Sequence, residues 1–143
     1  MLKIIIIGII VTTINLVIQA LGSLSWLRKI SVSVKEAHKL SNRTILRVLT
    51  VSFCLFTLIH SIHALVWALC YWIIPETGSE FSNFAEAVYF SLVTFTTLGY
   101  GDISLESEWR LLSGLEAING IMLIGWSTAM MYSLIQNIYK KLK

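Results

Sequence analysis

The residues best suited to bind an ion lie in one short stretch, which reads T-L-G-Y-G-D over residues 97–102. Its two glycines, Gly99 and Gly101, allow backbone angles that other residues rarely adopt. Successive carbonyl oxygens can then point to the same side. A row of carbonyls, with the Thr97 hydroxyl below it, can replace the water shell of a monovalent cation. One chain supplies only one wall, so a closed ring of ligands needs several copies.

The composition around this stretch is typical of a membrane protein. Of the 143 residues, 56% are hydrophobic and only 13% are charged, and the mean hydropathy is +0.76. These values argue against a soluble globular domain. The sequence contains no pairing of a nucleophile with a base and no metal-ligand cluster. We therefore expect no enzyme activity, no cofactor and no nucleic-acid partner, but contacts with membrane lipids.

Three apolar segments are each longer than the roughly 20 residues that a membrane-crossing helix needs. They predict helices over 1–28, 45–74 and 110–139. A shorter apolar segment, 84–95, would be only about 18 Å long as a helix, so it should enter the membrane and turn back. The expected fold is an all-α membrane protein with three transmembrane helices and one re-entrant helix.

The re-entrant segment begins with a helix-capping pattern. Asn83 precedes it, and Glu86 follows three residues later, as in a capping box. The negative end of this helix should then point into the membrane, which favours a cation near the centre of the bilayer.

Charge is distributed unevenly between the predicted loops, and this predicts the orientation. The linker 29–44 and the C-terminal tail are basic, whereas the loops on the other side are acidic. Because cytoplasmic loops are enriched in lysine and arginine, we expect an external N-terminus and a cytoplasmic C-terminus in the cell (inner) membrane. The linker fits an amphipathic surface helix and a solvated loop equally well.

The string T-T-L-G-Y-G-D over 96–102 resembles the selectivity filter of potassium channels, T-V/I/L-G-Y/F-G-D. The layout of residues 45–139 is similar to theirs as well: an outer helix, a pore helix at 84–95, a filter at 97–101 and an inner helix. The resemblance implies a homotetramer around a central pore. It implies potassium as the permeant ion, with ligands from Thr97, Leu98, Gly99 and Tyr100, Gly101 closing the outer mouth, and Asp102 just outside.

The sequence departs from this family pattern behind the filter. Some family members carry a tryptophan where this chain has Tyr89 and Phe90, and some carry a glutamate at the position of Val93. We expect the Tyr89 hydroxyl to reach Asp102 in place of those groups.

Within the inner helix, Gly120 matches by distance from the filter a glycine that acts as a hinge in many family members. That alignment directs Ile121, Ile124 and Thr128 to the pore cavity and makes Tyr132, with Gly120, a candidate gate. Close helix packing explains Gly120 equally well.

Several polar residues lie within the predicted membrane helices. Glu116 and Asn119 should face protein or water. Thr12, Asn15 and Gln19 form a stripe that should pack on the second helix or on a neighbouring subunit.

The second predicted helix contains two histidines and several aromatic residues. His60 and His63 are interpreted as packed neutral side chains bonded to neighbouring helices rather than as a metal site, because two ligands are too few. Trp67, Tyr71 and Trp72 are expected in an outer aromatic belt.

The sequence thus favours a potassium-selective channel that conducts passively. The alternatives are a non-conducting or modulatory channel-like subunit, a weakly selective cation channel and a potassium-transporter subunit. The intact filter and the single copy of the pore unit argue against these three.

Overall fold

The computed structural model describes residues 1–36 and 41–142. Their elements are α1 (Leu2–Glu36), α2 (Asn42–Ile73), α3 (Pro75–Gly78), α4 (Phe84–Phe95), the short 3-10 helix η1 (Ser107–Trp109) and α5 (Arg110–Leu142). The described part of the chain contains no strand. Three helices, α1, α2 and α5, are long and apolar enough to cross a membrane. This confirms the expected all-α membrane fold with three spans.

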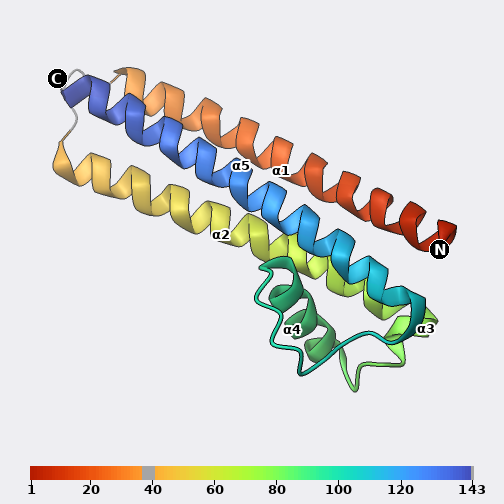
Figure 1. Cartoon of the computed structure of the whole chain (residues 1–143). Coiled ribbons are helices and arrows are strands. Elements are labelled where there is room, and N and C mark those ends of the chain that lie inside the picture. The colour runs from red at the N-terminus through yellow and green to blue at the C-terminus, as the bar shows by residue number, and fades with distance from the viewer. Residues whose placement is uncertain (37–40, 143) are drawn as a thin grey trace.

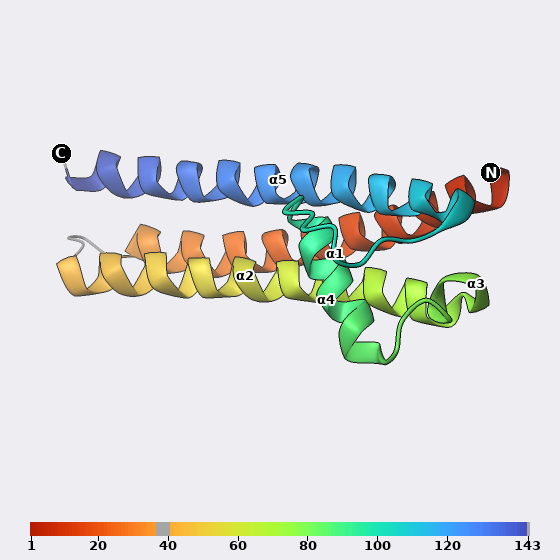
Figure 2. The same cartoon turned by 60° about the horizontal axis from the view of Figure 1, so that its bottom comes forward.

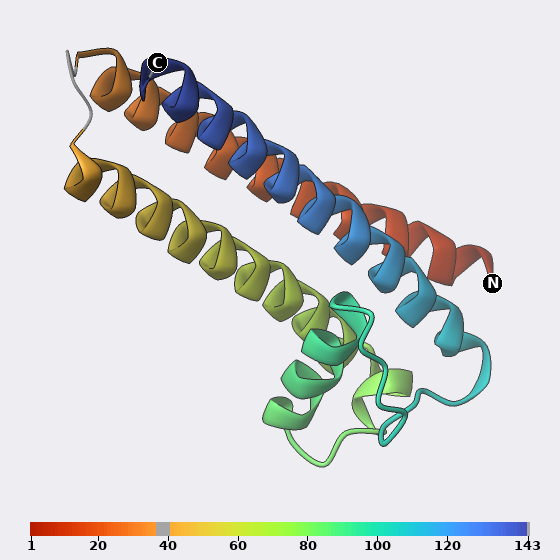
Figure 3. The same ribbon diagram turned by 60° about the vertical axis from the view of Figure 1, so that its left-hand side comes forward.

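The three long helices lie side by side, with the chain termini at opposite ends of the bundle (Figure 1). The shorter α4 packs against both α2 and α5. In Figure 2 it lies in front of these two helices, and α1 lies behind them. Figure 3 shows that the chain reaches α4 from the end where α2 finishes and returns to that end to begin α5. This is the path expected of a re-entrant segment.

Local sequence explains where α2 ends and α4 begins. Ile74 takes an extended conformation (φ −76°, ψ 117°) because the ring of Pro75 disfavours a helical residue before it. The Asn83 side chain accepts a hydrogen bond from the Glu86 backbone N–H at 3.0 Å, as the capping pattern predicted. The Glu86 carboxylate, however, accepts from the backbone N–H of Ser82 rather than from that of Asn83.

The first helix is longer than expected. It runs to Glu36 and so includes the first part of the segment 29–44 that was predicted as a linker. No glycine or proline occurs between Arg28 and Glu36 to stop it. Part of that predicted linker, residues 37–40, lies outside the described residues, and α2 begins at Asn42 rather than at 45.

Two of the three residues expected in an outer aromatic belt are instead completely buried within the chain. Trp67 and Tyr71 have no exposed surface, whereas Trp72 is 40% exposed. The Trp67 indole N–H donates to Asn119 at 3.0 Å, and the Tyr71 hydroxyl donates to Glu116 at 2.7 Å. Their polar tips therefore find partners inside the protein, and the belt assignment was wrong for both.

A seam of amide and hydroxyl groups joins α1 to α5. Asn15 donates to the Asn119 side chain at 3.1 Å, and Gln19 donates to the Ser127 hydroxyl at 2.9 Å. Asn15 also lies 3.5 Å from the His63 carbonyl of α2. The stripe packs on protein as predicted, but its main partner is the last helix rather than the second. Small and polar residues are the usual means by which membrane helices associate.

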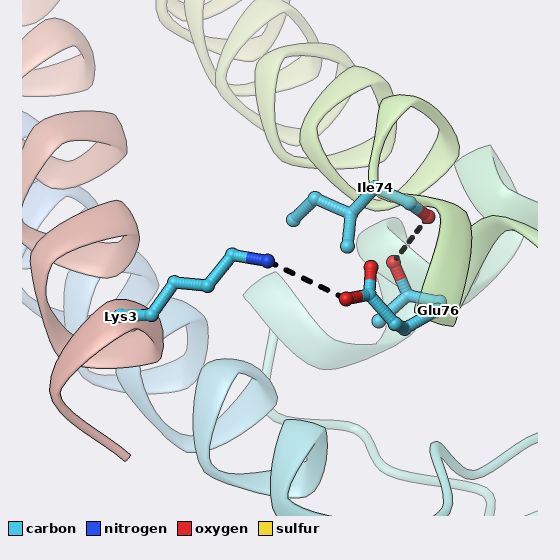
Figure 4. Close-up of polar contacts among 4 residues, drawn as sticks. Lys3, Ile74 and Glu76 are labelled. Carbon is cyan, nitrogen blue, oxygen red and sulfur yellow. Dashed lines mark hydrogen bonds and ion pairs between the residues drawn. The ribbon is translucent and has the colours of Figure 1, made fainter.

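The first turn of α1 is tied to α3, the short helix that follows α2. The Lys3 ammonium donates to the Glu76 carboxylate at 3.4 Å, as Figure 4 shows beside Ile74. A hydrogen bond from the backbone of Glu76 itself lowers the pKa of this carboxyl, and Lys3 adds to the effect. Lys3 also lies 5.4 Å from the centre of the Trp109 ring. The beginning of α1 and the beginning of α5 therefore lie at the same end of the bundle.

Where α4 ends, α5 presents Gly120 to it. A Cβ atom on Gly120 would collide with the backbone carbonyl of Phe95, the last residue of α4. This contact gives a specific reason for the glycine, because only a residue without a side chain lets the two backbones approach so closely. Close packing, one of the two interpretations of Gly120, thus has a direct structural basis.

Replacing Gly120 by alanine should destabilise the protein, because the obstacle is backbone and cannot rotate away. We expect a cost of about 1–3 kcal/mol, typical of overpacking, seen as a lower midpoint of thermal unfolding in detergent. Gly125→Ala is the matched control, since nothing lies within 4 Å of its Cβ position. Equal midpoints for the two variants would contradict the packing interpretation.

Candidate ion-binding site

The backbone of residues 97–101 alternates in handedness. Thr97, Gly99 and Gly101 all have positive φ, at 59°, 55° and 77°. Glycine adopts this region without strain, but a threonine there is uncommon. Such alternation of backbone handedness allows successive peptide carbonyls to turn to the same side of the chain.

The amide groups of this segment are directed back to α4. The N–H of Thr97 donates to the Thr94 carbonyl at 2.9 Å, and those of Leu98 and Gly99 donate to the Val93 carbonyl at 2.9 and 3.3 Å. Two of the carbonyls that a helix end leaves without partners, those of Val93 and Thr94, are thereby satisfied. The first three amides of the segment are therefore occupied on its α4 side.

Within a single chain, the segment 97–101 is not covered by other residues. The residues 97–101 are exposed, with Leu98 at 57% and Tyr100 at 67%. The Tyr100 ring therefore does not lie buried against the α4 of its own chain. Nothing in the sequence indicated that the Val93 backbone oxygen accepts from two amides of this segment, because the apolar side chain of Val93 carries no signal of it.

The aspartate after the segment is held by a tyrosine of α4. The Tyr89 hydroxyl donates to the Asp102 carboxylate at 2.8 Å, which confirms the predicted contact. Donation to that carboxylate raises the pKa of Tyr89. Phe90, which carries no hydrogen-bonding group, instead packs edge-on against Tyr71 and tilted against Phe81 in the core.

The candidate pore residues of α5 lie largely on a free face. Ile121, Thr128 and Tyr132 are exposed, whereas Ile124 is half-buried and packs against the core. The Thr128 hydroxyl donates to the Ile124 carbonyl of its own helix at 2.9 Å. The Tyr132 hydroxyl accepts from Gln136 at 3.1 Å. Ile121, Thr128 and Tyr132 therefore form a free face of α5, whereas Ile124 takes part in packing this helix on the core.

The two histidines of α2 pack around the end of α4. The rings of His60 and His63 lie 6.0 and 5.9 Å from the Phe95 ring. Packing was predicted, but the expected hydrogen bonds are not made: both ring nitrogens of His63 and Nδ1 of His60 lack protein partners. Among the described residues, no group of three or more His, Cys, Asp or Glu side chains is placed to hold a metal ion.

Helix arrangement and the carbonyl-lined segment together define a channel-type pore unit. The signature of the family described as "Ion channel" matches residues 48–137, which is more than half of the chain. The chain therefore belongs to the potassium channel pore family. The matched region extends from α2 through α4 to α5 and leaves out α1.

A known relative agrees with this family. The chain is 32% identical over 68 residues to two-pore potassium channel 1 of Arabidopsis thaliana, a match that covers 46% of this chain and 19% of the plant protein. The chain thus spans about a fifth of the length of that relative. No solved structure matches the chain significantly.

The Tyr89–Asp102 contact should stabilise the backbone around Gly101. In Tyr89→Phe we expect amide hydrogen exchange of a peptide covering 99–104 to be about two- to tenfold faster, the range for losing one hydrogen bond. Asp102→Asn should have a similar effect, measured by mass spectrometry. In the double variant the effects should not add, because both changes remove the same bond. Additive effects would contradict the pairing.

Proposed function

We propose that the chain is the subunit of a homotetrameric, potassium-selective channel that conducts potassium passively across the cell membrane. The observation that carries this proposal is the alternating left-handed backbone at Thr97, Gly99 and Gly101. With the amides of Thr97, Leu98 and Gly99 bonded to α4, the segment would turn a ladder of carbonyls to its other side. Such ladders replace the hydration shell of potassium in selectivity filters.

Four copies are proposed because one ladder surrounds an ion on one side only. In the tetramer, each of Thr97, Leu98, Gly99 and Tyr100 would contribute one ring of ligands, with Gly101 closing the outer mouth and Asp102 just outside it. A cleft of about 390 Å³ beside the segment, lined by Thr97 and Gly99 as well as residues of α5, leaves room for side chains of a neighbouring subunit. The exposed Tyr100 is the side chain that we assign to such a contact.

The rest of the pore follows from the free face of α5. Ile121, Ile124 and Thr128 would line the cavity below the filter, and Tyr132 would form the constriction. The domain division then is an N-terminal helix, a basic linker and a pore domain over about 45–139. We place the N-terminus outside and the C-terminus in the cytoplasm, because the basic segments then face inward.

Reconstitution into liposomes tests conduction and selectivity together. With a potassium gradient we expect potassium flux and much smaller sodium flux. The mass of the purified protein in detergent should correspond to four chains. Sodium flux of equal size would indicate the weakly selective alternative, no flux would indicate the non-conducting subunit, and any other oligomer would contradict the tetrameric pore.

Gly99→Ala separates filter conduction from leakage. A left-handed backbone costs a residue with a side chain about 1–2 kcal/mol, so we expect potassium flux to fall about tenfold or more. Gly125→Ala, the same substitution outside the filter, should conduct as the wild type does. Unchanged flux in Gly99→Ala would exclude the filter as the path of the ions.

A further inference from the structure

A glutamate in the membrane interior joins three helices. Glu116 of α5 is completely buried. One of its carboxyl oxygens faces the Tyr71 hydroxyl of α2 at 2.7 Å, and the other makes a short contact with the Ser91 hydroxyl of α4. The Ser91 hydroxyl also lies 2.7 Å from the backbone carbonyl of Ala64 in α2.

The number of protons available decides the ionisation state of this cluster. Three short oxygen–oxygen contacts, Tyr71–Glu116, Ser91–Glu116 and Ser91–Ala64, each need one proton. A hydroxyl group carries a single proton, so tyrosine and serine together supply two, and the Ala64 carbonyl supplies none. The third must come from the carboxyl group of Glu116. A carboxylic acid donates to Ser91, Ser91 donates to Ala64, Tyr71 donates to Glu116, and every contact is satisfied.

The surroundings of Glu116 do not offer a positive charge. Among the described residues, the ionisable groups that interact with it are Tyr71 and Cys70, both on α2, and neither is a cation. His60 and His63 of the same helix face Phe95 instead. An unpaired carboxylate inside a membrane protein is costly. Burial therefore points in the same direction as the proton count.

We propose that Glu116 is held as a neutral carboxylic acid and that it is a positioning residue for the filter, fixing α4 to both α2 and α5. Ser91 lies two residues before Val93, whose carbonyl receives the amides of Leu98 and Gly99. A shift of α4 at Ser91 therefore moves the acceptor that orients the filter carbonyls. The role in filter positioning rests on the proposed channel function; the neutral state does not.

Infrared spectroscopy tests the neutral state without reference to conduction. At neutral pH the wild-type protein should show the carbonyl stretching band of a protonated carboxylic acid, and Glu116→Gln should lack it. Glu106→Gln is the matched control, since Glu106 is exposed and lies outside the buried cluster, so the band should persist. Absence of the band from the wild type would overturn the proposal, whatever the flux assays show.

Substitutions then test positioning. Glu116→Gln replaces the acid by an amide that can donate to Ser91 and accept from Tyr71, so potassium flux and potassium-over-sodium selectivity should stay within about twofold of the wild type. Glu116→Ala leaves two buried hydroxyl groups without their partner, and selectivity should fall about tenfold or more. The comparison is made per tetramer, so that a loss of folded protein is not counted as a loss of selectivity.

Two results would overturn the positioning role. One is a glutamine variant as impaired as the alanine variant, since a neutral bridge would then be insufficient. The other is an alanine variant that folds and keeps wild-type selectivity. If the wild type itself does not conduct potassium, the channel function fails, and the infrared band still decides the state of Glu116.

Discussion

The arrangement of this protein depends on one constraint: in a membrane, each backbone N–H and C=O group must find a partner within the protein. Three long helices meet it by themselves. Irregular chain can meet it only beside another source of partners, and here the end of α4 is that source. The amides of Thr97, Leu98 and Gly99 bond to the Thr94 and Val93 carbonyls. This segment and the end of α4 thus supply hydrogen-bond partners to each other.

A similar constraint acts on polar side chains, and two pairs of them join α1 to α5. Asn15 with Asn119, and Gln19 with Ser127, place their polar groups against one another. The helix α1, which lies outside the matched family region, is attached to α5 by these bonds. The helix α1 therefore packs against α5 as part of the bundle, in addition to any role in anchoring the chain in lipid.

Features governed by short-range sequence were predictable. The bounds of α4 follow from the Asn83 cap and the length of the apolar run. The contact between Tyr89 and Asp102 was predictable because the two residues are only 13 positions apart in the sequence. The partners of Glu116 are 45 and 25 residues away, and no local pattern indicates them. A tyrosine such as Tyr71, with an apolar ring and a polar tip, suits a membrane interface and a satisfied core equally well. The end of α1 was misplaced because basic residues mark the edge of a membrane but do not stop a helix.

The contact between Gly120 and the Phe95 carbonyl has a mechanical consequence. Side chains between two helices normally absorb small displacements by changing rotamer. At Gly120 no side chain intervenes, and backbone lies directly against backbone. Helix α5 therefore cannot tilt towards α4 without pushing on Phe95, the residue that leads into the segment 96–101. Any such tilt would be passed to that segment as a rigid displacement.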